Sequence, residues 1–247
     1  MNTLRQYVRS TIVETVITGR KLERYARIIT HEVIQAVKDP EVRDYFVEHG
    51  LAQFSLQGVT ALNDIDYLRD VIIVLEEGPE ISASAGYEFD LDATPEQRRD
   101  SDLRVSLTLP TRFSDRVLGH ITEELIDAVR HELEHSSQST ETLMGVHDTI
   151  KSEDDIWSSL EGIEAYYVNQ AETPAHTAGW VQRAKSKGVE AADVIDEELY
   201  NIYATALDKG HSEKALQPLM KKLRDIYQYY LMKRWPEQDW PIEMRDQ

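Results

Sequence analysis

The apolar residues of this chain recur at two different spacings, and the change between them limits the possible folds more than any other feature of the sequence. In residues 3–48, and again from Ser114 to near the C-terminus, they recur every three or four positions, as on one face of a helix. Between residues 52 and 110 they alternate with polar residues or form short unbroken runs, which is typical of strands. The sequence therefore predicts an α+β fold that is predominantly helical, with a small sheet in the middle of the chain.

Three segments of this middle zone predict individual strands. Residues 71–75 read VIIVL, and an apolar run of this length before a Glu-Glu-Gly-Pro turn suits a buried strand. GYEFDLD at 86–92 and LRVSLTL at 103–109 alternate apolar with polar residues, so each has the period of a strand with one buried face. We expect a small, mostly antiparallel sheet of roughly three or four strands.

Proline and glycine mark the ends of the N-terminal helices. Two helices are predicted before Asp39-Pro40, and the second ends there because a residue before proline avoids the α region. Gly50 ends a short third helix that begins at Glu41. After the sheet, helices are predicted from Ser114/Asp115 onward and near 154–170, 174–187, 191–208 and 212–233. The expected parts of the chain are an N-terminal helical segment (1–50), a core (51–187) and a C-terminal helical segment with a tail (188–247).

The composition excludes several kinds of site and partner. The 247 residues include no cysteine, so a metal site has to be built from His, Asp and Glu. The formal net charge of -18 predicts no binding to nucleic acid or to anionic membrane surfaces. The chain has no apolar run of about 18 residues and no signal-peptide pattern. We therefore expect no transmembrane segment and a cytoplasmic location.

The segment DAVRHELEHSSQ at 127–138 contains the pattern H-E-x-x-H, formed by His131, Glu132 and His135. Residues four apart lie one helical turn above each other, so both imidazoles point the same way, as two ligands of one ion must. Glu132 lies beside that stripe, where its carboxylate can reach a metal-activated water without binding the metal. The charged side chain of Glu134, inside the motif, has to face solvent or a partner. The alternative is a pair of histidines on an amphipathic surface helix that is rich in glutamate.

A strand, a turn and then an H-E-x-x-H helix resemble the zincin metallopeptidases over roughly residues 70–180. The resemblance implies a zinc-dependent peptidase in which His131 and His135 bind Zn²⁺ and Glu132 is the general base. It also implies a strand that aligns the peptide substrate along a free edge. LRVSLTL (103–109) is the candidate for this strand, and an ordinary sheet strand is the alternative.

A third protein ligand is needed to complete such a site. The metzincin extension of the motif is absent, because Gln138 and Glu141 occupy the places of its glycine and histidine. YYVNQAETPAH at 166–176 is similar to the stretch that supplies this ligand in gluzincin-like small proteins predicted in tailed-phage and bacterial genomes. The similarity assigns the third ligand to Glu172, near a helix N-terminus whose dipole favours a carboxylate. Glu164 is the alternative.

Other side chains near the motif keep more than one interpretation. His176 follows Glu172 by four residues and shares its helix face, as a replacement ligand, a donor to the developing oxyanion, or a structural residue. Tyr166 and Tyr167 are either phenol donors to the reaction intermediate or core residues. His147 has no assignable role.

Two functions of different class follow from these patterns. The first is a zinc metallopeptidase acting on a peptide or protein substrate, with a ligand set that also accepts Co²⁺ or Mn²⁺. The alternative is a non-catalytic structural or interaction protein with a zincin-like fold and a vestigial or structural metal site, such as a phage virion component. A homo-oligomer or a virion assembly partner is expected in that case, in the host cytoplasm or in the virion.

Overall fold

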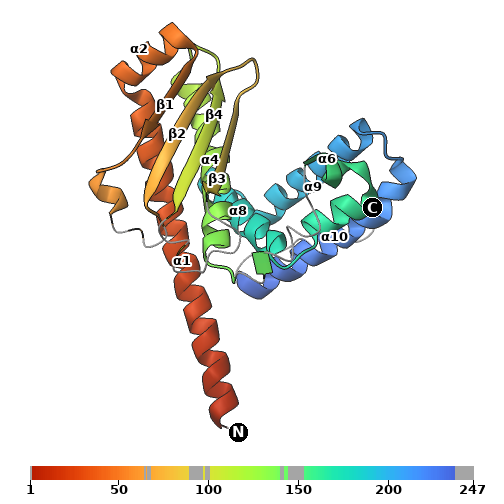
Figure 1. Ribbon diagram of the computed structural model, residues 1–247. Coiled ribbons are helices and arrows are strands. Elements are labelled where there is room, and N and C mark those ends of the chain that lie inside the picture. The colour runs from red at the N-terminus through yellow and green to blue at the C-terminus, as the bar shows by residue number, and fades with distance from the viewer. Residues whose placement is uncertain are drawn as a thin grey trace. The chain divides into compact units, whose positions relative to one another are not determined.

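The computed structural model describes the backbone of residues 2–63, 65, 68–88, 97, 101–139, 142–143 and 153–236, and the side chains of these residues from 19 onward other than 88, 153 and 154. Figure 1 shows its helices and strands. Before the motif helix come α1 (Asn2–Lys38), α2 (Pro40–His49), β1 (Leu51–Ser55), the 3-10 turn η1 (Thr60–Leu62), β2 (Asp70–Glu77), β3 (Ser82–Glu88) and β4 (Asp102–Leu109). The motif helix is α4 (Asp115–Ser136), and after it come α6 (Glu153–Ser158), α7 (Leu160–Tyr167), α8 (Glu172–Lys187), α9 (Ala191–Asp208) and α10 (Glu213–Arg234).

Contacts between residues divide the chain into two compact units. The first comprises residues 1–88 and 101–133, and the second comprises residues 89–100 and 134–247. Helix α4 is continuous across this division. The H-E-x-x-H motif therefore begins at the end of one unit and finishes at the start of the other.

A four-stranded sheet with the order β1-β2-β4-β3 forms the centre of the first unit. β2 and β4 are parallel, with Ile73 opposite Val105, whereas β1 is antiparallel to β2 and β3 is antiparallel to β4. The predicted α+β class and the placement of the sheet before the motif helix are confirmed. The sheet is mixed rather than purely antiparallel, because β4 lies between β2 and β3 and runs in the direction of β2.

The expectation that residues 103–109 offer a free edge to a peptide is wrong. β4 is paired along its length with β2 on one side and with β3 on the other. An alternating pattern predicts which face of a strand is buried, but it carries no information on whether the strand is central. The edge strands of this sheet are β1 and β3. Of the predicted strand GYEFDLD, β3 includes Tyr87, while Phe89 and Leu91 lie outside the described residues.

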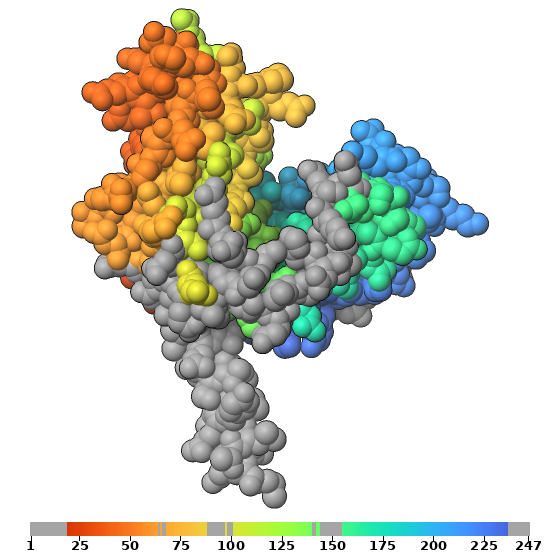
Figure 2. All heavy atoms as spheres, viewed as in Figure 1, coloured from red at the N-terminus to blue at the C-terminus, as the bar shows by residue number. Residues whose placement is uncertain are grey.

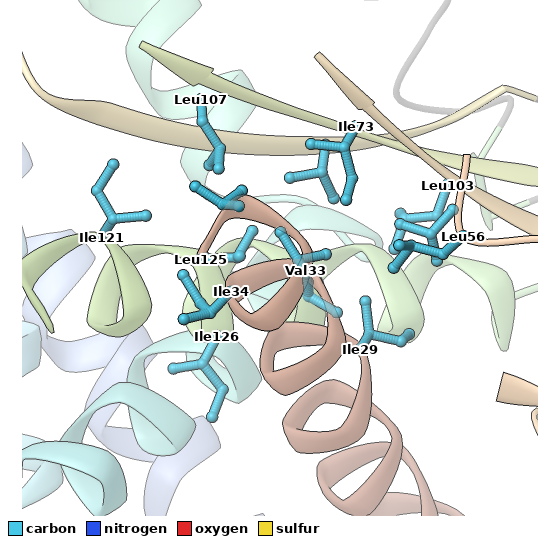
Figure 3. Close-up of a cluster of buried hydrophobic side chains, with 14 of the residues drawn as sticks. Ile29, Val33, Ile34, Leu56, Ile73, Leu103, Leu107, Ile121, Leu125 and Ile126 are labelled. Carbon is cyan, nitrogen blue, oxygen red and sulfur yellow. The ribbon is translucent and has the colours of Figure 1, made fainter. Parts of the chain in front are cut away.

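The hydrophobic core of the first unit lies between the sheet and helices α1 and α4 (Figure 3). Ile29 of α1 and Leu107 of β4 are fully buried there. Burial of a side chain of this size contributes about 1.5–3 kcal/mol relative to exposure. Leu125, Val129 and Leu133 form the buried stripe of α4. This stripe fixes the rotation of α4 about its axis, and with it the directions of the motif side chains that flank the stripe.

Local signals set the ends of the N-terminal helices as predicted. Asp39 caps α2 by accepting a hydrogen bond from the backbone N–H of Glu41 at 2.8 Å, and Pro40 occupies the first turn. Gly50 ends α2 with a φ of 69°, a left-handed conformation that glycine adopts without strain. The two helices expected before Pro40 are instead one continuous helix, α1, over residues 2–38.

The second unit is helical in its described part and has its own core. Trp180 of α8, Leu199 of α9 and two residues of α10, Leu223 and Tyr227, are buried together. The space-filling view shows part of the surface of the helices of this unit, coloured green to blue (Figure 2). Within the described ranges of both units, no helix combines the length and the apolar character needed to cross a membrane.

Burial of Tyr227 predicts a loss of stability at alkaline pH. Its phenol is fully buried and donates a hydrogen bond to the carbonyl of Tyr167 at 3.1 Å. Burial, followed by the nearby Tyr167, Tyr166 and Glu172, raises the pKa of Tyr227 well above its ordinary value of 10.0. The unfolded chain releases this proton near pH 10 while the folded chain retains it, so the free energy of unfolding falls as the pH rises above about 10.

Denaturant unfolding between about pH 9 and pH 11 measures this dependence. We expect Tyr227→Phe to remove a slope of up to about 1.4 kcal/mol per pH unit. Tyr200→Phe, at a ring that is 68% exposed, is the matched control and should keep the slope of the unmodified protein. Equal slopes in the unmodified protein and in Tyr227→Phe would contradict this prediction.

Candidate metal centre

The last two turns of α4 carry the three residues of the H-E-x-x-H motif. His131 and His135 lie one turn apart, and the ligand atoms of His131, Glu132 and His135 lie within 4.8 Å of one another. All three side chains are largely buried. The helical context that the sequence predicts for the motif is therefore present.

Two glutamates of α4 hold the edge strand β3. The backbone N–H of Ala83 donates to Glu124 Oε2 at 3.2 Å, and that of Tyr87 donates to Glu132 Oε2 at 3.3 Å. The distance between the two glutamates along α4 matches the distance between Ala83 and Tyr87 along β3, because eight helical residues advance about 12 Å and four strand residues advance about 13 Å. Glu132 is thus oriented by β3, and its other carboxylate oxygen lies 3.9 Å from His131 Nε2.

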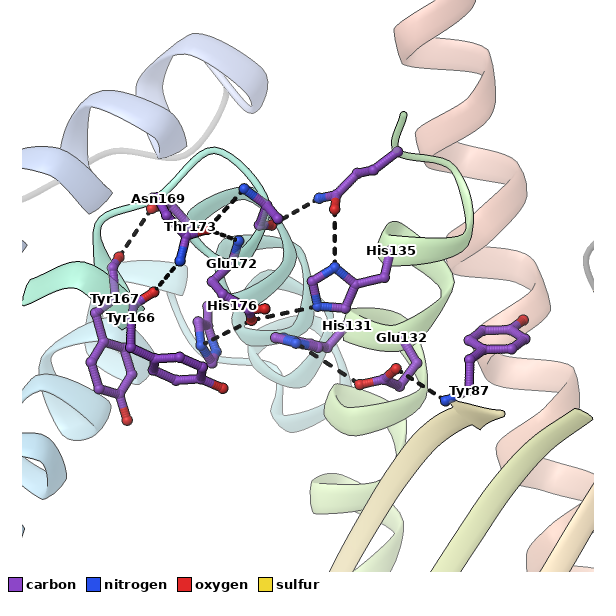
Figure 4. Close-up of polar contacts among 12 residues, drawn as sticks. Tyr87, His131, Glu132, His135, Tyr166, Tyr167, Asn169, Glu172, Thr173 and His176 are labelled. Atoms are coloured by element: carbon purple, nitrogen blue, oxygen red, sulfur yellow. Dashed lines mark hydrogen bonds and ion pairs between the residues drawn. The ribbon is translucent and has the colours of Figure 1, made fainter. Parts of the chain in front are cut away.

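Two imidazoles of the second unit converge on one carboxylate oxygen (Figure 4). Glu172 Oε2 lies 3.4 Å from His135 Nε2 and 3.8 Å from His176 Nε2. His135 belongs to the last turn of α4, whereas Glu172 and His176 are one turn apart at the start of α8. The three side chains are only 10%, 13% and 16% exposed. Imidazole nitrogen and carboxylate oxygen are a typical donor set for zinc.

The spacing of His135 and Glu172 fits two ligands of a tetrahedral zinc ion. Metal–ligand distances of about 2.0–2.2 Å place adjacent ligand atoms of a tetrahedron roughly 3.3–3.5 Å apart. A direct ion pair between imidazolium and carboxylate would bring nitrogen and oxygen to about 2.7–2.9 Å. The observed distance of 3.4 Å therefore matches ligands that share an ion better than it matches a direct hydrogen bond.

A turn between α7 and α8 sets the position of Glu172. Asn169 Oδ1 accepts hydrogen bonds from the backbone N–H groups of Ala171 at 2.9 Å and Glu172 at 2.6 Å. Asn169 Nδ2 donates to the carbonyls of Ala165 at 3.1 Å and Tyr166 at 2.6 Å. One side chain thus satisfies backbone groups at the end of one helix and at the beginning of the next.

Gln138 connects the end of α4 with the start of α8. Its Oε1 lies 3.0 Å from Nδ1 of His135, and its Nε2 donates to the carbonyl of Ala171 at 2.8 Å. Ala171 directly precedes Glu172. A single amide therefore contacts the ring of one candidate ligand and the backbone beside another.

Aromatic side chains surround the ring of His176. It stacks on Trp180, with the ring centroids 5.3 Å apart and an interplanar angle of 26°. Tyr167 lies at 5.3 Å and 30°, and Tyr166 meets the ring edge-on at 5.6 Å. These contacts orient the imidazole with its Nε2 toward Glu172.

Glu134, the charged residue inside the motif, is buried and faces a partner, Arg234. Arg234 Nη1 donates to Glu134 Oε1 at 2.5 Å, and Nη2 donates to Oε2 at 2.9 Å. Arg234 lies in the last turn of α10. This bidentate ion pair ties the C-terminal end of α10 to the last turn of the motif helix.

The remaining sequence candidates lie elsewhere. Glu164, the alternative third ligand, has a side chain that is 43% exposed and forms an ion pair with Lys222 at 2.6 Å. His147 lies outside the described residues. Of the two candidates for the third ligand, the structure brings Glu172 to His135 and places Glu164 in a surface ion pair.

Gln138 and Asn169 are site residues to which the sequence alone assigns no role. Both have a local signal, since Gln138 follows His135 by nearly one helical turn and Asn169 precedes Glu172 at the spacing of a helix cap. Arg234 has no such local signal in the sequence, because it lies 100 residues from its partner Glu134.

The ion pair of Glu134 and Arg234 predicts a stability effect. Removing one partner of a buried pair leaves the other charge uncompensated, so we expect Glu134→Gln or Arg234→Met to lower the free energy of unfolding by about 3 kcal/mol. The double variant should lose about 0.5–3 kcal/mol less than the sum of the single losses. Denaturant unfolding of all four proteins measures this coupling. Lys233→Met, at the exposed neighbour of Arg234, is the control. If the double variant lost as much unfolding free energy as the two single variants together, the prediction would be contradicted.

Comparison of the chain with protein-family models, with curated proteins and with solved structures finds no match. The resemblance to the zincins thus depends on the motif and on its context in the fold.

Proposed function

We propose that this protein is a zinc-dependent metallopeptidase in which His131, His135 and Glu172 hold the metal and Glu132 is the general base. The observation that carries the proposal is the 3.4 Å contact between His135 Nε2 and Glu172 Oε2. The two atoms belong to residues 37 positions apart in sequence, their side chains are largely buried, and their separation is that of adjacent ligands of a tetrahedral ion.

His131 is assigned to the ligand set with His135 and Glu172 because of its place on α4. It lies one turn before His135 in a continuous helix, so both imidazoles project on the same side. Their ligand atoms fall within 4.8 Å of each other. His176 lies 3.8 Å from the same oxygen of Glu172, where it is placed to hold that carboxylate or to stabilise a developing oxyanion.

Glu132 is suited to act as the base. Zinc, when bound in such a site, activates a water molecule and polarises the scissile carbonyl. The carboxylate of Glu132 would accept the proton of the attacking water and pass it to the leaving amine. The hydrogen bond from Tyr87 N–H to Oε2 fixes the orientation of this carboxylate, so the base is positioned before substrate arrives.

Edge strand β3 is the part of the sheet nearest to this base. Its N–H groups at Ala83 and Tyr87 point outward from the sheet, since they donate to side chains of α4 rather than to β4. Because Glu124 and Glu132 already accept hydrogen bonds from these two N–H groups, a peptide that added to β3 at Ala83 and Tyr87 would have to displace both carboxylates. The contact with β3 therefore serves to orient the base.

Metal analysis of the purified full chain tests the site. We expect close to one zinc ion per chain, and a large loss of zinc in His131→Ala, His135→Ala and Glu172→Gln. His120→Ala is the matched control, because His120 lies on the same helix with a side chain that is 59% exposed, and it should leave the zinc content unchanged. Substoichiometric zinc that these substitutions leave unaltered would rule out the site.

Turnover of a mixed library of internally quenched peptides tests catalysis separately. Glu132→Gln should keep the zinc content and lower kcat about 10²–10⁴-fold, the usual contribution of a general base. Full retention of hydrolysis in Glu132→Gln would exclude the proposed base. Stoichiometric zinc without hydrolysis of any library peptide would favour the alternative, a non-catalytic protein with a structural metal site.

A further inference from the structure

We propose that Gln138 is a positioning residue that holds the neutral ring of His135 in its Nδ1–H tautomer and so keeps Nε2 available to a metal ion. The inference rests on the proposed metal site and concerns how the protein prepares that site. Its observations are the two hydrogen bonds of the Gln138 amide, both within the second unit.

The direction of the Gln138 amide follows from its partner at Ala171. A backbone carbonyl can only accept a hydrogen bond, so the amide nitrogen has to face Ala171 O, which lies 2.8 Å away. The amide oxygen is then the atom 3.0 Å from His135 Nδ1. Because that oxygen can only accept, Nδ1 has to carry the proton. A neutral imidazole has one N–H group, and this places a lone pair on Nε2 of His135.

That lone pair faces another acceptor. Nε2 of His135 lies 3.4 Å from the Oε2 atom of Glu172. Two acceptors cannot hydrogen-bond to each other, and their approach becomes favourable when a cation lies between them. In the opposite tautomer, Nε2–H would donate directly to Glu172 and the two candidate ligands would satisfy each other. Among the neutral forms of the ring, Gln138 therefore disfavours the tautomer that competes with metal binding.

The same amide fixes the start of α8. The Gln138 amide donates to the carbonyl of Ala171, the residue directly before Glu172. This bond ties the start of α8 to the segment that follows His135. One side chain thereby sets the tautomer of one ligand and the backbone position of the other. Outer partners of this kind typically change metal affinity 10–100-fold when they are removed.

The tautomer can be read directly by long-range ¹H–¹⁵N NMR of the metal-free full chain with ¹⁵N-labelled histidine. The spectra are recorded at about pH 8.5, where an ordinary imidazole is neutral. The unmodified protein should show His135 as the Nδ1–H tautomer, and Gln138→Ala should convert it wholly or largely to the Nε2–H tautomer. Gln138→Glu retains an acceptor for Nδ1–H and should keep the tautomer of the unmodified protein. Gln170→Ala, at an exposed glutamine beside Ala171, is the matched control.

Zinc affinity, measured by competition with a chromogenic chelator, gives the second readout. We expect the dissociation constant to rise about 10–100-fold in Gln138→Ala and to stay unchanged in Gln170→Ala. An Nε2–H tautomer in the unmodified protein, or an unchanged tautomer in Gln138→Ala, overturns the role of Gln138 even if zinc binds. Absence of zinc binding in the unmodified protein overturns the proposed function instead, and the tautomer measurement still decides the role of Gln138. If Gln138→Ala does not fold, the unmodified protein and Gln138→Glu carry the test.

Discussion

One local constraint governs the candidate centre: the carboxylate of Glu172 has to be held close to the ring of His135 while both side chains are largely removed from solvent. Two polar groups in such surroundings are costly unless a hydrogen bond or a cation compensates them. Asn169 and Gln138 position the backbone around Glu172. Glu134, one residue before His135, is tied to α10 by Arg234. The polar network of the second unit is thus organised around keeping this short distance.

Helix α4 links this network to the core of the first unit. Its apolar stripe packs beneath the sheet, and the same rotation about the helix axis determines where the motif side chains point. Glu124 and Glu132 use the flank of the helix to hold edge strand β3 through its backbone N–H groups. The proposed base is therefore fixed by the sheet, whereas His135 is fixed by the hydrogen bonds at the end of the helix. Peptidase chemistry would require both sets of contacts at once.

The sequence predicts those features that depend on short-range physics. Proline and glycine mark the ends of α2, helix α9 has the predicted bounds 191–208, and Glu172 lies beside His135 as the resemblance implies. The order of the strands could not be predicted in this way, because β4 is central through its pairing with β2 and β3 and the alternation of apolar and polar residues does not encode pairing. The pairing of Arg234 with Glu134 cannot be predicted from the sequence either, since the two residues are 100 positions apart and no local pattern connects them. Gln138 has a local spacing, but its importance depends on the carbonyl of Ala171, which only the fold brings to it.

Diffraction from crystals of the full chain grown with zinc, recorded at the zinc absorption edge, locates the metal. If His131, His135 and Glu172 hold zinc, we expect one strong anomalous peak per chain, about 2.0–2.2 Å from both His135 Nε2 and Glu172 Oε2 and within bonding distance of His131. A peak elsewhere, or an ordered structure in which His135 and Glu172 form a direct hydrogen bond with no metal between them, would contradict this ligand set.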